Sequence, residues 1–118
     1  MVHAWRILSI VCGLCVLMPG CGPSGPELGL VEGTVRMDGA PVPYANVEFI
    51  PENGRPSDGI TNEQGSYKLQ YTRDRTGALV GKHTVRVSTE RGPDQFQDSQ
   101  GKPLPGSRET VPARYNQE

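Results

Sequence analysis

The sequence predicts an all-β fold, a small β-sandwich that occupies the chain after its first 30 residues. Apolar and polar residues alternate in several short segments of this region, which is the pattern of half-buried strands. Glycine and proline contribute 15 and 11 of the 118 residues, a composition that favours short strands joined by tight turns. After residue 21, no Gly- and Pro-free window of ten or more residues shows apolar residues at the 3.6-residue period of a helix.

The first 20 residues predict a signal peptide that the mature protein lacks. Residues 7–18 read ILSIVCGLCVLM and carry no charge. A helix that spans a bilayer needs roughly 20 apolar residues, whereas the apolar part of a signal peptide needs about 7 to 15. A short membrane anchor or a buried helix is the alternative interpretation.

The end of the apolar run, LMPGC at residues 17–21, resembles the lipobox of bacterial lipoproteins. The resemblance implies cleavage after Gly20 and acylation of Cys21, although Met18 and Pro19 depart from the residues most common at their positions. We therefore expect an exported lipoprotein, anchored to a membrane of the cell envelope through Cys21.

Cysteine usage favours the same interpretation. Cys12 and Cys15 form a Cys-x-x-Cys pair, but both lie in the segment that cleavage would remove. Cys21 would then be the one cysteine of the mature chain, and acylation accounts for it without a disulfide partner. A free Cys21, or one paired with another chain, is the alternative.

The mature chain is expected to consist of a tether and one domain. Residues 21–29 are rich in Gly, Pro and Ser and predict a flexible tether, while residues 30–118 predict the β-sandwich domain. Alternation predicts four clear strands, in residues 30–37, 45–50, 66–71 and 83–89. A fifth, weaker strand is predicted at residues 59–61. The apolar residues expected to form the core are Val31, Val35, Met37, Val47, Phe49, Ile60, Tyr67, Leu69, Tyr71, Val85 and Val87.

Two reversals of the chain stand out. Asn62–Gly65, NEQG, has the residues of a type I turn, and we expect Gly65 to adopt a positive φ. Asp38 and Gly39 also signal a reversal. Because Pro41 and Pro43 cannot donate ladder hydrogen bonds, we expect a looser loop there than a two-residue hairpin.

Three stretches together resemble the carboxypeptidase regulatory-like domain: VEGTVRMDGAPVPYANVEFIP, TNEQGSYKLQY and GALVGKHTVRVST. The resemblance covers about residues 30–89 and implies a transthyretin-like, prealbumin-type sandwich, similar to an immunoglobulin fold. VPARYN, residues 111–116, is similar to the tail of small bacterial lipoproteins that carry one such domain. The resemblance also implies a closing strand beyond this tail. We expect the sandwich to lack that strand and to leave an edge open, unless residues 111–115 cover it.

The sequence offers no constellation of catalytic residues, and we expect no enzymatic activity and no cofactor. His83 is the one histidine after the predicted signal peptide, and the carboxylates are scattered without the spacing of a calcium loop. The transthyretin-like hydrolases rely on several histidines and a carboxy-terminal motif that this chain lacks. A net charge of −1 gives no reason to expect a nucleic-acid partner.

Two segments are candidate interaction surfaces. One contains Tyr71, Arg73 and Arg75, and the other is the long polar loop of residues 91–109 with its single aromatic residue, Phe96. Long loops are either binding elements or plain solvated segments, and both alternatives stay open here. We expect an interaction or structural module whose partners are the membrane and an envelope protein or polysaccharide. The alternative is a carbohydrate- or small-ligand-binding protein, favoured if Phe96 and Tyr71 line one groove.

Overall fold

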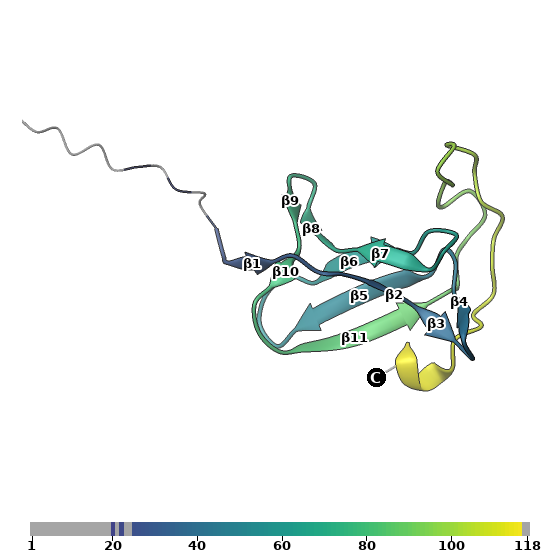
Figure 1. The fold of residues 1–118 in the computed structure, drawn as a ribbon, viewed down its shortest axis with the longest axis horizontal. Helices are drawn as coiled ribbons and strands as arrows, with labels where there is room; N and C mark the ends of the chain where they lie inside the picture. The colour runs from purple at the N-terminus through teal and green to yellow at the C-terminus, as the bar shows by residue number, and fades with distance from the viewer. Residues whose placement is uncertain (1–19, 21, 23–24, 117–118) are drawn as a thin grey trace, which may run out of the picture.

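The structure, a computed structural model, describes residues 20, 22 and 25–116 (Figure 1). Residues 1–19 of the predicted signal peptide and Cys21 lie outside these residues. The described part is all-β, with eleven strands and one short 3-10 turn, η1 (Ala113–Tyr115). The described part contains no helix that is long and apolar enough to cross a membrane.

The main sheet has five antiparallel strands in the order β11-β5-β6-β8-β9. Its longest pair joins β5 (Asn46–Pro51) and β11 (His83–Ser88), with Val47 opposite Val87 and Phe49 opposite Val85. The other three strands are β6 (Ser57–Ile60), β8 (Gln70–Thr72) and β9 (Arg75–Thr76). The sheet confirms the predicted strands in residues 45–50 and 83–89 and the weak fifth strand.

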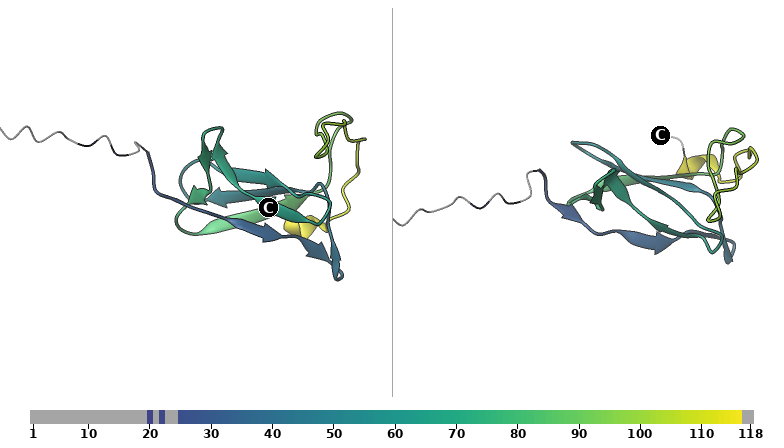
Figure 2. Two further views of the ribbon diagram at one scale, coloured as in Figure 1. Left: turned by 45° about the horizontal axis from the view of Figure 1, so that its top comes forward. Right: turned by 90° about the horizontal axis from the view of Figure 1, so that it is seen from above.

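Shorter strand pairs form a second layer beside the main sheet (Figure 2). They join β1 (Leu28–Gly29) with β10 (Ala78–Leu79), and β2 (Glu32–Thr34) with β7 (Ser66–Lys68). Leu69 links the layers, because its N–H donates to Val31 O at 2.9 Å and its carbonyl accepts from Gly77 N at 2.8 Å. The predicted strand of residues 66–71 therefore exchanges partners at Leu69, and pairing begins at Leu28, inside the segment expected to be a flexible tether.

The reversal at Asp38–Gly39 is a two-residue hairpin, so the expectation of a looser loop was wrong. It joins β3 (Arg36–Met37) to β4 (Ala40–Pro41), and both turn residues have positive φ, 51° and 80°. Bonded and non-bonded pairs alternate along an antiparallel ladder. Since Val42 N donates to Val35 O at 3.0 Å, Pro41 occupies a non-bonded position where no N–H is needed.

The turn at Asn62–Gly65 forms as predicted, with Gly65 at a φ of 76°. Gly65 N donates to Asn62 O at 3.0 Å, and the Asn62 side chain accepts from the backbone of Gln64 and Ser66. Gly65 O in turn accepts from Val35 N at 2.8 Å. The predicted strand of residues 30–37 is divided at Val35 into β2 and β3, and the bond from Val35 ties the turn to the β3–β4 hairpin.

The core is centred on Val47, Leu69 and Ala78, with Val31, Val35, Phe49, Tyr67 and Val87 packed against them. Five buried apolar residues were absent from the predicted core: Val42, Ala45, Ala78, Leu104 and Val111.

Three residues assigned to the core are exposed instead, Met37, Ile60 and Val85. Ile60 pairs with Asn46 on the outer face of the sheet, one residue out of phase with Val47. Met37 closes the β3–β4 hairpin. Val85 shares the inner face with Phe49, but on the edge strand β11 it stays 46% exposed.

Candidate functional site

The domain has two ends with different contents (Figure 1). We call the end formed by β1, β9 and β10 the tether end, because the chain enters the domain there. The opposite end, which we call the loop end, carries the 62–65 turn and residues 91–109. Tyr71, Arg73 and Arg75 lie on the β8–β9 hairpin toward the tether end, whereas Phe96 lies at the loop end. The structure thus separates the two candidate surfaces.

Arg75 fixes the segment that leads into β1. Its guanidinium donates to Pro26 O at 2.7 Å and lies 5.8 Å from the centre of the Tyr71 ring. Arg73 lines a shallow hollow beside Tyr71, together with Arg55 and Asp58. Arg75 therefore holds the start of the domain in place, a role that the sequence pattern did not indicate.

The 91–109 loop is folded back on itself as an irregular hairpin. Arg91 and Ser107 exchange two backbone hydrogen bonds of 3.0 Å. Further along the hairpin, Leu104 N donates to Phe96 O at 2.8 Å, and the Leu104 side chain is buried. These bonds place Phe96 in a folded element.

Glu109 closes the base of this loop. Its carboxylate accepts hydrogen bonds from Ser88 Oγ at 2.5 Å, from Thr89 N and Oγ1 at 3.0 and 2.8 Å, and from Val111 N at 2.8 Å. Burial alone would raise the pKa of Glu109, but these hydrogen bonds outweigh it and lower the pKa to about 2. The carboxylate thus stays ionised and ties the returning chain to the end of β11.

Tyr44 is the most unusual residue at the loop end. Its φ is 54°, a conformation that bulky residues rarely adopt. Three contacts hold it there: its N–H donates to Thr61 O at 3.0 Å, its carbonyl accepts from Arg91 at 3.4 Å, and its hydroxyl donates to Glu63 at 3.0 Å.

Thr61 supports this conformation from within the core. Its side chain is fully buried, and its hydroxyl accepts from Ala45 N at 2.8 Å and donates to Val42 O at 2.7 Å. One side chain therefore satisfies a backbone acceptor two residues before the strained Tyr44 and the backbone donor directly after it.

Tyr44 and Phe96 line one groove of about 490 Å³ between the 62–65 turn and the folded loop. We call it the Tyr44–Phe96 groove. Ile60 adds apolar surface, and Asn62, Glu63, Gln64, Gln97, Asp98 and Ser99 add polar groups. Tyr71 is not part of it, so the pair of aromatic residues considered in the sequence does not meet. Sequence reasoning missed Tyr44, because nothing in the pattern PVPYAN signals a tyrosine at positive φ.

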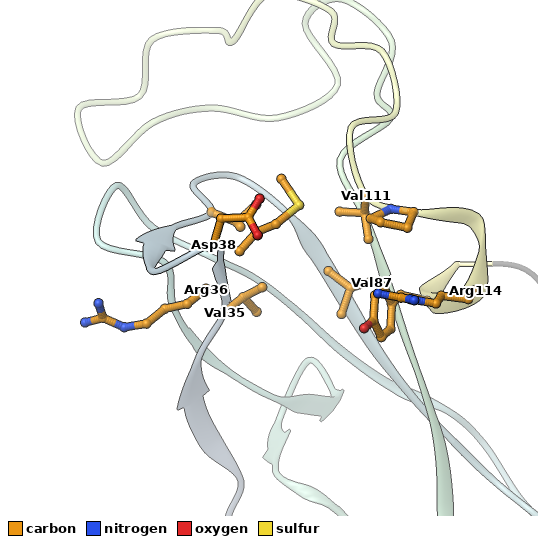
Figure 3. Close-up of a pocket in the computed structure, with 10 residues that line it drawn as sticks. Val35, Arg36, Asp38, Val87, Val111 and Arg114 are labelled. Carbon is orange, nitrogen blue, oxygen red and sulfur yellow. The ribbon is translucent and has the colours of Figure 1, made fainter.

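A second groove, of about 440 Å³, lies between the β3–β4 hairpin and η1 (Figure 3). In Figure 3, Val35, Arg36 and Asp38 form one side, and Val87, Val111 and Arg114 form the other. Its lining is mainly apolar and includes Met37 and Tyr115.

The titratable residues of the described part form no group of three or more His, Cys, Asp or Glu side chains able to hold a metal ion. His83 Nε2 donates to Leu79 O at 2.7 Å, and the ring packs 5.7 Å from that of Phe49. These contacts give His83 a structural role.

No family model, no curated protein and no solved structure matches this chain. The expected kinship with the carboxypeptidase regulatory-like domain therefore stays a prediction.

Proposed function

We propose that this protein is a lipid-anchored, non-enzymatic module of the cell envelope that holds a transthyretin-like sandwich at the membrane and binds a partner through its loop end. The observation that carries the proposal is the position of the predicted acylation site relative to the fold. Cys21 precedes Pro26 by five residues, and Pro26 is already held by Arg75. A span of that length reaches at most about 17 Å.

Such a short connection would keep the tether end close to the lipid surface. The loop end lies at the far side of the domain, so it would face away from the membrane (Figure 1). Partner binding at the loop end agrees with the folded 91–109 loop and the Tyr44–Phe96 groove, because binding residues concentrate on loops that a rigid scaffold positions.

The anchor is tested by substituting Cys21 with Ser in the full chain and measuring incorporation of labelled palmitate in cells. We expect the label to be lost and the uncleaved precursor to accumulate. Cys15→Ser is the matched control, because it removes a cysteine of the apolar run and should leave labelling and cleavage intact. Equal labelling of Cys21→Ser and the unsubstituted chain would refute acylation at Cys21.

A further inference from the structure

We propose that the Tyr44–Phe96 groove binds a neutral sugar ring of an envelope polysaccharide. This inference names a class of partner for the proposed function. It rests on the proposed function for the location of the protein in the envelope, whereas the groove itself does not depend on the lipid anchor. Three features of the groove carry the proposal: its two aromatic rings, its hydrogen-bonding groups and its charge.

The aromatic rings come from separate parts of the chain and are each half-buried. Tyr44 precedes β5, whereas Phe96 lies in the folded loop. Flat aromatic rings offer apolar surface to the C–H faces of a pyranose without requiring an enclosed cavity. The Arg91 guanidinium lies 5.8 Å from the centre of the Tyr44 ring, which helps to fix the ring in one orientation.

The rigidity of Tyr44 also favours a binding role. A glycine could adopt its positive φ without strain, yet a tyrosine occupies the position with its N–H, carbonyl and hydroxyl all bonded. Backbone strain of this kind clusters at binding sites, where it presents a side chain in a fixed pose. A fixed ring loses little conformational freedom when a ligand stacks on it.

The polar groups of the groove suit a ligand rich in hydroxyls. The side chains of Gln64 and Gln97 are exposed and offer both donors and acceptors, and Ser99 adds a hydroxyl. Glu63 uses one carboxylate oxygen to accept from Tyr44, which leaves its second oxygen to accept from a sugar hydroxyl. A small number of such groups around apolar surface is typical of ligand sites.

The charge of the groove disfavours anionic ligands. Glu63 and Asp98 both line it, and its described lining contains no Lys, Arg or His. Arg91, beside the Tyr44 ring, is one positive charge against these two carboxylates, and its guanidinium donates to the carbonyls of Tyr44 and Pro105. Burial, the hydrogen bond to Glu63 and the charges of Glu63 and Asp98 outweigh the opposing charge of Arg91 and raise the pKa of the Tyr44 hydroxyl, so Tyr44 stays a neutral donor. Phosphates, sulfates and uronic acids would meet an excess of like charge here, which favours neutral sugars as the ligand class.

The test is calorimetric titration of the full chain in lipid nanodiscs, which avoids sugar-based detergents that would compete for the groove. The probes are cellohexaose and fully N-acetylated chitohexaose, both neutral, and hexagalacturonate is the anionic comparison. We expect at least one neutral hexasaccharide to bind, with hexagalacturonate about tenfold weaker or worse.

Phe96→Ala should weaken that binding by about tenfold or more, since it removes one stacking surface. Tyr71→Ala is the matched control, because it removes a half-buried tyrosine near the tether end and should leave binding unchanged. Gln64→Ala, on the exposed turn, is a second test that does not touch the 91–109 loop, and it should also weaken binding. Circular dichroism of each variant would verify the fold.

Absence of binding by both neutral probes at about 10 mM would overturn the proposal. Equal affinity for hexagalacturonate, or affinity unaffected by Phe96→Ala and Gln64→Ala in folded protein, would overturn it as well. No sugar binding together with normal labelling of Cys21 would refute the sugar ligand but not the lipid anchor. Sugar binding without labelling would refute the lipid anchor but not the sugar ligand.

Discussion

Replacing Gly65 with Ala tests the turn that joins the two layers. The added Cβ would lie 2.6 Å from Val35 O and 3.1 Å from Val42 N, both backbone atoms that cannot rotate away. The left-handed conformation costs an L-residue about 1–2 kcal/mol. Displacing Val35 would also weaken its 2.8 Å hydrogen bond to Gly65 O, at about 1 kcal/mol. We expect a total loss of about 2–3 kcal/mol in the free energy of unfolding.

Gly39→Ala provides a matched control. Gly39 has a φ of 80°, close to the 76° of Gly65, but its added Cβ would meet nothing within 4 Å. It should therefore cost only the conformational strain of about 1–2 kcal/mol. Urea unfolding of the full chain, followed by circular dichroism, gives both values. Equal losses in the two variants would refute the steric part of the argument, and an unchanged Gly65→Ala would refute the turn itself.

Two further predictions concern buried polar contacts. Because the pKa of Glu109 is lowered to about 2, its hydrogen bonds stabilise the fold above the ordinary carboxyl pKa of 4.5 and are lost as the pH falls toward 2. Because solvent screens the half-buried carboxylate, we expect these hydrogen bonds to contribute about 1 kcal/mol to the free energy of unfolding. The urea midpoints at pH 7 and pH 3 should therefore differ less in Glu109→Gln than in the unsubstituted chain. An identical pH dependence of the two proteins would contradict this. Thr61→Val should cost about 2–4 kcal/mol by leaving Ala45 N and Val42 O unsatisfied. Ser57→Ala is its control, because that buried hydroxyl has no hydrogen-bond partner among the described residues and its removal should cost almost nothing; equal thermal shifts in the two variants would show that the Thr61 hydrogen bonds do not stabilise the fold.

The all-β fold and the 62–65 turn could be predicted because local chemistry determines them. Alternation fixes which residues of a strand face inward, and Asn62 and Gly65 are the residues that a type I turn needs. The sequence could not show which face of the sheet Ile60 occupies, because β6 contains only this one large apolar residue and therefore no alternation.

The features missed in the sequence depend on contacts between distant segments. Leu28 pairs with Leu79, and Arg75 reaches Pro26, across about fifty residues of chain. In neither pair does the sequence around one residue indicate which residue it contacts. The Tyr44–Phe96 groove likewise forms only when the 91–109 loop returns to β11 and is fixed by Glu109.

The two edges of the main sheet differ in a way that limits how the protein can assemble. At one edge β11 pairs with β5 along all six of its residues, η1 lies beside it without pairing as a strand, and Val85 remains exposed. At the other edge β9 has only two residues, too few to template a long partner. A sheet with one usable edge can gain strands in one direction only. Two copies joined through β11 would occupy both long edges, so growth of this sheet would stop at a closed pair rather than continue into a fibre.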